Sequence, residues 1–252
     1  MEYDLSDTKA LPVLAVSPLP GLSLKLEQSN DTQSHGTTVW HSAIQLAFYL
    51  ADILKPPTFN LEEGILHPKE NKRCLELGSG CGLSGLTMAA FGFDTTLTDL
   101  PVVVDKVLTA NATQNLASIK DYWCDLQQAH QHSAHMSDPK IRAKPLDWLD
   151  LDASSNWLEN HYHYILSADC IYSIDLVQPL LECIFKLSSP TTIVLVAMER
   201  RDALVVDGFV EKARSKGFDA RIIPKKMVRT ALTNNEDVEI WKLKKKRTKN
   251  ES

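Results

Sequence analysis

Cysteine is scarce in this sequence, and no two cysteines are spaced as a CxxC pair. The chain of 252 residues contains five of them, an odd number, scattered along its length. Such a set does not indicate the disulfide framework of a small secreted domain. We therefore expect free thiols in a reducing compartment. The five are Cys74, Cys81, Cys124, Cys170 and Cys183.

Long apolar runs and an excess of positive charge are missing as well. No stretch approaches the roughly 18 apolar residues that cross a bilayer, and the polar first residues do not resemble a signal peptide. The net charge is −5 at pH 7, which does not indicate a basic surface for binding nucleic acid. We expect a soluble, cytoplasmic monomer without a membrane or nucleic-acid partner. The basic stretch at residues 244–249 also allows a nuclear location, because such stretches can act as nuclear localisation signals.

An alternation of strand-like and helical segments follows residue 73. With 44% apolar residues, a chain of this length suits one large domain. Repeated βα units predict the α/β class: a Rossmann-like, seven-stranded, mostly parallel sheet with helices on both faces. The expected strands are residues 74–77, 95–98, 141–146, 162–168, 193–198, 220–223 and 238–243, and the expected helices include 82–91, 174–187 and 203–216.

The remaining segments complete the expected layout. Residues 1–35 combine prolines, a glycine and alternating leucines, which predict short strands in an N-terminal β appendage. Residues 36–243 would form the main domain, and residues 244–252 a flexible basic tail. Residues 55–72 are expected to be a connector. The polar residues 117–139, which include three histidines, are expected to be a surface loop.

Side chains and turns with functional chemistry fall where four of these strands end. A glycine-rich turn at residues 78–82 separates the first strand from a helix, and Asp99 comes 21 positions after Gly78. Glycine allows close backbone approach to a ligand, and an acidic residue after the second strand can bind a ribose diol. Asp147-Trp148 and Asp169 follow the third and fourth strands. Ligands of parallel sheets bind at this edge, so the pattern predicts a nucleotide-type cofactor site.

Two cofactors compete for this turn. Gly80, Gly82 and Gly85 match G-x-G-x-x-G with an acid about 20 residues on, which is typical of NAD-dependent oxidoreductases. Glu76, two places before Gly78, extends the pattern to Glu-x-Gly-x-Gly-x-Gly. In this form the sequence resembles the class I methyltransferases, which use S-adenosyl-L-methionine on a seven-stranded sheet. The resemblance implies a turn against the methionine part of the cofactor and Asp99 on its ribose hydroxyls.

Four motifs in order narrow the resemblance: Gly36-Thr37-Thr38-Val39-Trp40, Thr98-Asp99-Leu100-Pro101, Leu146-Asp147-Trp148 and Asp169-Cys170-Ile171-Tyr172. Together they resemble the methyltransferase-like protein-lysine methyltransferases, which share an acid-x-x-Tyr signature after the fourth strand. Members of that group modify chaperones, AAA-type ATPases or translation elongation factors, so a protein lysine is the implied substrate. The implied cofactor-binding residues are Trp40, Glu76, Gly78, Ser79, Gly80, Gly82, Asp99, Asp147, Trp148 and Ala168, and the implied catalytic residues are Asp169 and Tyr172. Leu149 departs from the pattern, because a glycine commonly follows the Asp-Trp pair.

The chemistry of lysine methylation gives the last two residues their roles. A lysine amine attacks only when it is neutral, and its free pKa is about 10.4. Dehydration and a nearby cation both lower that pKa. Our hypothesis is that Asp169 orients the incoming ammonium by a charge-assisted hydrogen bond and that Tyr172 walls the channel. A carboxylate alone would oppose deprotonation, so the proton would leave through water. Residues 199–202 would border the same channel.

Other interpretations remain open from the sequence. Trp40 and Trp148 suit a packed core, and Asp169 suits a helix cap. The substrate could instead be a small molecule. A nucleic-acid base is disfavoured, because no proline follows Asp169 and no basic stripe is evident. His130, His132 and His135 lack a cysteine or carboxylate partner at ligand spacing, so we expect no metal site.

Overall fold

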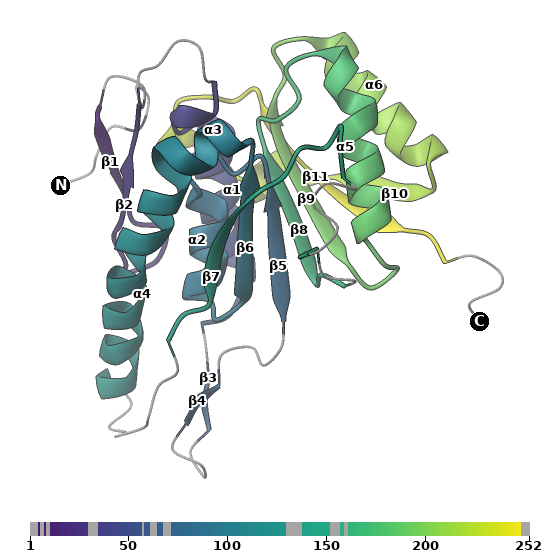
Figure 1. Ribbon diagram of the computed structural model, residues 1–252. Coiled ribbons are helices and arrows are strands. Elements are labelled where there is room, and N and C mark those ends of the chain that lie inside the picture. Colours follow the sequence, from purple (N-terminus) through teal and green to yellow (C-terminus); the bar gives the residue numbers. More distant parts are fainter. Residues whose placement is uncertain are drawn as a thin grey trace.

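A parallel sheet with one reversed strand forms the centre of the molecule (Figure 1). The computed structural model describes Leu5, Thr8 and residues 11–29, 35–56, 58–60, 65–67, 72–129, 138–151, 157–158 and 161–247. Within these residues seven strands pair in the order β10-β11-β9-β8-β5-β6-β7. Among these seven, β11 alone runs opposite to the other six strands. The strands are β5 (Arg73–Leu77), β6 (Asp94–Asp99), β7 (Ile141–Pro145), β8 (Tyr164–Ala168), β9 (Ile193–Glu199), β10 (Phe218–Ile222) and β11 (Val238–Lys245).

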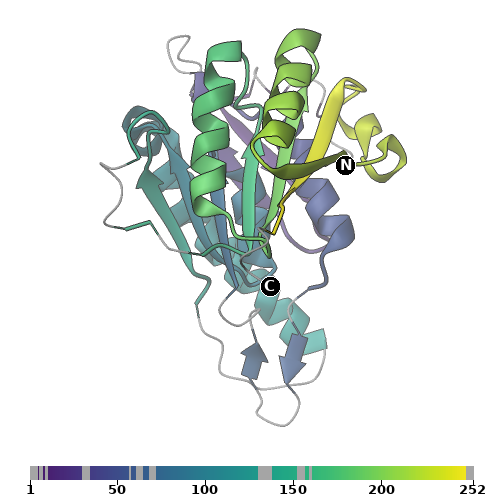
Figure 2. The ribbon, with the colours of Figure 1, turned by 90° about the vertical axis from the view of Figure 1, so that its right-hand side faces the viewer.

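Helices cover both faces of this sheet, as the βα alternation predicts. The helices α5 (Ile174–Leu187) and α6 (Ala203–Ser215) lie side by side on one face (Figure 2). The helices α1 (His41–Ile53), α2 (Leu83–Ala90) and α4 (Thr109–Ala129) pack on the other face. Two hydrophobic cores result, one on each side of the sheet. The apolar stripe of α5 (Val177, Leu180, Leu181, Ile184) is typical of a helix that buries one face.

The predicted N-terminal appendage is a hairpin of β1 (Val13–Val16) and β2 (Leu24–Glu27) beside α4 (Figure 1). Two asparagines on one face of α4 satisfy the open edge of β2. Asn111 Oδ1 accepts from the Glu27 N–H at 2.8 Å, and Asn115 Oδ1 accepts from the Lys25 N–H at 2.9 Å. Their amide groups donate back to the carbonyls of the same two residues. The edge strand is thereby closed against further pairing.

The expectation of a surface loop over residues 117–139 is wrong for its first half, because α4 continues to Ala129. Buried side chains at Ile119, Tyr122 and Trp123 anchor this helix, and the Trp123 indole donates to the Ala90 carbonyl at 2.8 Å. The polar composition misled the prediction, since few apolar residues are enough when each is fully buried. His130, His132 and His135 lie outside the described residues.

Smaller differences concern the other connecting segments. The expected connector at 55–72 contains a short hairpin, β3 (Thr58–Asn60) with β4 (Ile65–His67). Strand β11 runs to Lys245, two residues farther than expected, and the Lys245 ammonium donates to the Phe185 and Ser188 carbonyls. The last described residue is Arg247. No helix in the described ranges is long and apolar enough to cross a membrane.

Two further turns of helix follow β6 on the path to α4. They are α3 (Pro101–Val103), with Pro101 at its first position, and a π-helical turn, η2 (Val104–Leu108). Proline is tolerated there because its missing N–H would have no intrahelical partner. These turns, the loop before α1 and the segments after β7, β8 and β9 surround the carboxyl ends of the parallel strands, where the predicted site residues meet.

Candidate functional site

A cavity of about 510 Å³ opens where β5, β6, β7, β8 and β9 end. Its walls come from the loop before α1, the glycine turn (residues 78–82) and the segments that follow β6, β7, β8 and β9. All but one of the predicted site residues line it. These are Trp40, Gly78, Ser79, Gly80, Gly82, Asp99, Asp147, Trp148, Ala168, Asp169 and Tyr172. The tertiary structure therefore gathers into one space residues that are up to 132 positions apart.

The glycine turn can pass between β5 and the loop before α1 only because it lacks side chains at two points. At Gly78 (φ +61°) a Cβ would lie 2.3 Å from Cys170 Sγ, and at Gly80 (φ +55°) it would lie 2.8 Å from the Gly36 carbonyl oxygen. Both conformations belong to the left-handed region that glycine favours. The Ser79 N–H donates to the Thr98 carbonyl at 2.8 Å, which fastens the turn to β6.

Glu76 lies beneath the turn and outside the cavity. Its side chain is buried, and its Oε2 accepts from the Gly85 N–H at 3.1 Å, in the first turn of α2. Burial raises the pKa of Glu76 to about 7, although hydrogen bonds from Gly85, Ser79 and Ser84 oppose the shift. The structure thus separates Glu76 from the other predicted cofactor-binding residues. It supports the turn from below rather than lining the space above it.

Asp99 ends β6 with both carboxylate oxygens aimed at backbone N–H groups. Oδ2 accepts from the Gly80 N–H and Oδ1 from the Leu100 N–H, each at 2.8 Å. Burial raises the pKa of this carboxyl, and the two hydrogen bonds act in the opposite direction. A carboxylate oxygen has two lone pairs, so each can accept one more bond on the cavity side. A rigid pair of acceptors of this kind suits the two hydroxyls of a ribose.

The segment after β7 forms an apolar wall. Trp148 packs against the glycine turn, since its ring would lie 3.1 Å from a Cβ at Gly78. Asp147 Oδ1 accepts from the Leu149 N–H at 2.9 Å, which closes a local turn. Leu149 is 74% exposed at the mouth of the cavity. Leu149, which stands where the family commonly has a glycine, therefore fits because its side chain is exposed and its backbone is not left-handed.

Asp169 follows β8 in a left-handed conformation, with φ +56°. Its N–H donates to the Ala197 carbonyl at 2.8 Å, so β9 holds this unusual backbone in place. The helix-cap interpretation is excluded, because Ser173 is the N-cap of α5 and accepts from the Asp175 N–H. Asp169 therefore does not cap α5; its Oδ1 instead accepts from the Glu199 N–H at 3.3 Å.

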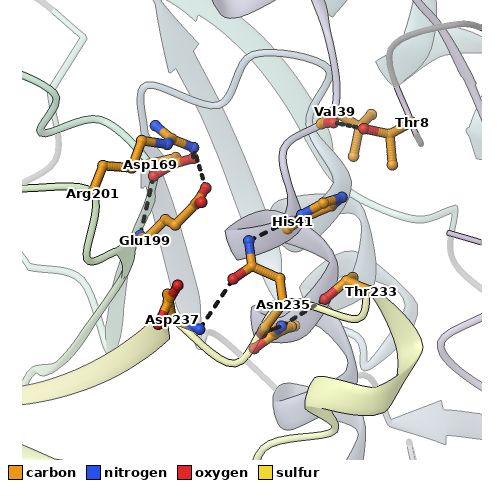
Figure 3. A network of polar contacts seen from close by, with 10 residues as sticks. Thr8, Val39, His41, Asp169, Glu199, Arg201, Thr233, Asn235 and Asp237 are labelled. Carbon is orange, nitrogen blue, oxygen red and sulfur yellow. Dashed lines mark hydrogen bonds and ion pairs between the residues drawn. The ribbon is translucent and has the colours of Figure 1, made fainter. Parts of the chain in front are cut away.

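The Asp169 carboxylate belongs to a charged network that includes Arg201 (Figure 3). Its side chain is only 3% exposed, and Oδ2 accepts from Arg201 Nη2 at 2.7 Å. The same guanidinium nitrogen bonds Glu199, and the guanidinium carbon lies 4.7 Å from the centre of the Trp40 ring. Arg201 is 41% exposed and lines the cavity. A cation is thus already held between two carboxylates and an aromatic ring, a favourable setting for a guanidinium.

Sequence reasoning missed three contributors to this space. From the sequence, Arg201 was expected only to border the substrate channel. No local pattern indicates that it pairs with Asp169, which lies 32 positions earlier in the chain. Cys170 packs its sulfur under the turn, with Sγ 3.3 Å from the Leu77 carbonyl oxygen. Gly36 covers Gly80 from the other side. A strand-end position was the available signal for Arg201.

Tyr172 stands at the mouth of the cavity, 63% exposed, on the segment between β8 and α5.

Among the described residues no group of three or more His, Cys, Asp or Glu side chains could hold a metal ion. The strand order also differs from the dinucleotide-binding sheet, in which the sixth strand follows the fifth. Here the antiparallel β11 lies between β9 and β10.

Comparison with known sequences gives one family and several relatives. A family model described as lysine methyltransferase matches residues 19–216. The chain is 28% identical over 182 residues to the protein-lysine methyltransferase METTL21E of Mus musculus, covering 72% of this chain and 62% of the relative. It is 29% identical over 181 residues to the protein N-lysine methyltransferase METTL21A of Danio rerio, covering 71% of this chain and 67% of the relative. For the first relatives the match spans 52% to 62% of their own length.

Among solved structures, the fold is similar to a TehB-like SAM-dependent methyltransferase of Corynebacterium glutamicum. The TM-score is 0.51 with 15% sequence identity, over 80% of this chain and 88% of that chain. At this level of identity the similarity concerns the fold alone. It agrees with the predicted Rossmann-like sheet of the class I methyltransferases.

Proposed function

The chain belongs to the lysine methyltransferase family, and from this premise we propose that it transfers a methyl group from S-adenosyl-L-methionine to a lysine side chain of a protein. The observation that carries the proposal is the meeting of the four predicted strand ends around one cavity. Its relatives are named for protein-lysine methylation. A chaperone or a translation elongation factor is the substrate class that the resemblance suggests.

The residues present fit the cofactor. Asp99 offers two fixed acceptors for ribose hydroxyls, and the glycine turn exposes backbone without side chains beside it. Trp148 supplies an apolar wall of the kind that an adenine ring prefers. When bound, S-adenosylmethionine supplies an electrophilic methyl group on a positively charged sulfur.

The site must then hold the substrate lysine with its amine in the neutral form. A bare carboxylate at Asp169 would hold an incoming lysine in its charged form. In this site Arg201 balances that carboxylate at 2.7 Å, so the lysine meets a pair of opposite charges. Asp169 and Tyr172 would orient the amine by hydrogen bonding, and the proton would leave to water. Leu149 and Tyr172, which line the cavity, are exposed to solvent, which favours contact with a macromolecule over full enclosure of a small molecule.

Two measurements test the proposal. Thermal melting with S-adenosylhomocysteine at about 100 times its dissociation constant should stabilise the protein by about 2.7 kcal/mol, whereas NAD should have no effect. Stabilisation by NAD alone would make the oxidoreductase the better interpretation. Labelling an extract from cells that lack this gene with tritiated S-adenosylmethionine should then give a labelled protein band whose modified lysine is identified by mass spectrometry. Label confined to nucleic acid or to small molecules would contradict the proposal.

A further inference from the structure

Exposed apolar side chains gather around the mouth of the cavity. We define the rim as residues 99–104, 146–151, 169–175 and 199–204, the segments that follow β6, β7, β8 and β9. In the described part of the chain, eleven large hydrophobic residues are exposed, and six of them are on the rim. They are Leu100, Val102, Leu149, Tyr172, Ile174 and Leu204. An apolar surface concentrated in this way marks an interaction site.

The rim is also strongly acidic. It contains seven acidic residues and two basic ones, and both arginines are engaged within the molecule. Arg200 pairs with Glu239 and Asp207, and Arg201 with Asp169 and Glu199. Asp150, Asp175 and Asp202 are exposed carboxylates of the rim. In addition to the carboxylates that pair with these arginines, Asp175 and Asp202 therefore bring negative charge to the surface around the cavity.

This charge belongs to one edge of the sheet. At the opposite edge the strands β5 and β7 begin, and β11 ends, among lysines. These include Lys72, Lys140, Lys244, Lys245 and Lys246. Lysines therefore lie at the opposite end of the strands from the acidic rim. A negative surface repels phosphate groups, which argues against a nucleic acid or an anionic membrane as the occupant.

We propose that the rim docks a protein segment in which basic residues and an apolar side chain flank the target lysine. The inference rests on the proposed function and adds the chemistry of the substrate to it. Basic flanking residues are attracted by the rim, and an apolar neighbour contacts Leu149 and Leu204, which are 74% and 80% exposed. An acidic segment is repelled before its lysine reaches the cavity.

The test uses binding, so it does not depend on catalysis. Fluorescein-labelled peptides with one central lysine are titrated with the full chain in the presence of S-adenosylhomocysteine, and the anisotropy is measured. Peptides with arginine and leucine flanks should bind about tenfold more tightly than peptides with glutamate and leucine flanks. This preference should shrink when salt is raised from about 50 to about 200 mM, because exposed charges are screened.

Two variants locate the binding on the rim. Asp150→Asn/Asp175→Asn/Asp202→Asn removes three charges, and asparagine keeps the N-cap that Asp202 gives to α6. Leu149→Ser/Leu204→Ser removes the apolar contacts. Each set of substitutions should weaken the affinity for the basic peptide about fivefold. The matched controls are Asp219→Asn, at the opposite edge, and Ile222→Ser, an exposed apolar residue of β10 away from the rim; both should bind as the parent does.

The outcomes separate this proposal from the proposed function. Equal binding of basic and acidic peptides, or no loss in the rim variants, would overturn it even if the chain methylates a protein. Preferential binding of basic peptides would stand even if the extract shows no labelled protein. Concentration-dependent dimerisation that the rim variants abolish would assign the surface to a second copy of this chain and likewise overturn the proposal.

Discussion

The two halves of the cavity are built in different ways. On the β5–β6 side, the glycine turn and Asp99 are held by backbone groups: Ser79 to Thr98, Gly80 to Asp99 and Leu100 to Asp99. On the β8–β9 side, backbone bonds to β9 also hold Asp169, but its carboxylate pairs with the side chain of Arg201, which in turn bonds Glu199 (Figure 3). The guanidinium of Arg201 also lies over the ring of Trp40. Ser79 on the first side is buried, whereas Arg201 and Tyr172 on the second side are well exposed.

The difference indicates what each half can tolerate. Backbone hydrogen bonds in a buried turn fix one geometry, because an unmade bond there is costly. A partly exposed ion pair contributes little stability and can be exchanged. We therefore expect substitutions on the β5–β6 side to damage folding and cofactor binding, and substitutions on the β8–β9 side to change methyl transfer while the fold and the cofactor affinity persist.

The largest expected effect is that of Gly78→Ala. The new Cβ would lie 2.3 Å from Cys170 Sγ on a backbone with φ +61°, so the free energy of unfolding should fall by about 4 kcal/mol. Binding of S-adenosylhomocysteine should be lost. Urea denaturation and calorimetry measure the two effects. Gly217→Ala is the control, because Gly217 has φ +102° but open space around it, so only the conformational cost should appear.

The variant Glu76→Gln tests the role of the buried Glu76 carboxyl under the glycine turn. The measured quantity is the pH dependence of the free energy of unfolding. Because burial raises the pKa of Glu76 from 4.5 to about 7, the folded state keeps a proton that the unfolded state loses over this range. The contribution of Glu76 to stability is therefore present below pH 4.5 and is lost as the pH rises to 7. It amounts to about 3 kcal/mol. The stability difference between parent and variant should fall by that amount from pH 4.5 to pH 8 in urea melts; a constant difference would contradict the shift.

Asp99→Ala removes the acceptors at the end of β6. The affinity for S-adenosylhomocysteine should weaken about 100-fold, which is about 2.7 kcal/mol, since hydrogen bonds to a charged group are lost. Asp99→Asn keeps one acceptor and should give an intermediate loss. Isothermal titration calorimetry measures both. An affinity within about threefold of the parent would mean that Asp99 does not contact the ligand.

Arg201→Gln should have the smallest effect and should leave cofactor affinity unchanged. Without the guanidinium, Asp169 holds the substrate lysine as an ammonium more strongly, so methyl transfer should slow about tenfold near pH 7. The acidic limb of the kcat–pH profile should also move to higher pH, and Arg201→Lys should restore it. Arg200→Gln is the matched control, because Arg200 pairs with Glu239 and Asp207 instead. A slower rate with an unmoved profile would leave Arg201 a purely structural role.

Parts of the molecule differ in how far the sequence alone predicts them. The glycine turn, Asp99 and the succession of strands along the chain could be predicted, because a tight turn and a buried strand leave local patterns in residue type and spacing. The extent of α4 was missed, since the many polar residues of this segment obscure the helical spacing of Ile119, Tyr122 and Trp123, which are all buried. Glu76 was recognised as part of the glycine pattern, but only the structure places its side chain outside the cavity, where it accepts from the Gly85 N–H.

By itself the sequence determined the α/β class, the N-terminal appendage and the edge of the sheet at which a ligand would bind. These depend on period, turn chemistry and strand ends, which are properties of short segments. Only the tertiary structure decided that Arg201 neutralises Asp169 against Trp40, and that acidic and apolar residues from four segments form one rim. Such relations join residues that are distant in the chain, and their energies depend on distance and burial, which no local pattern encodes.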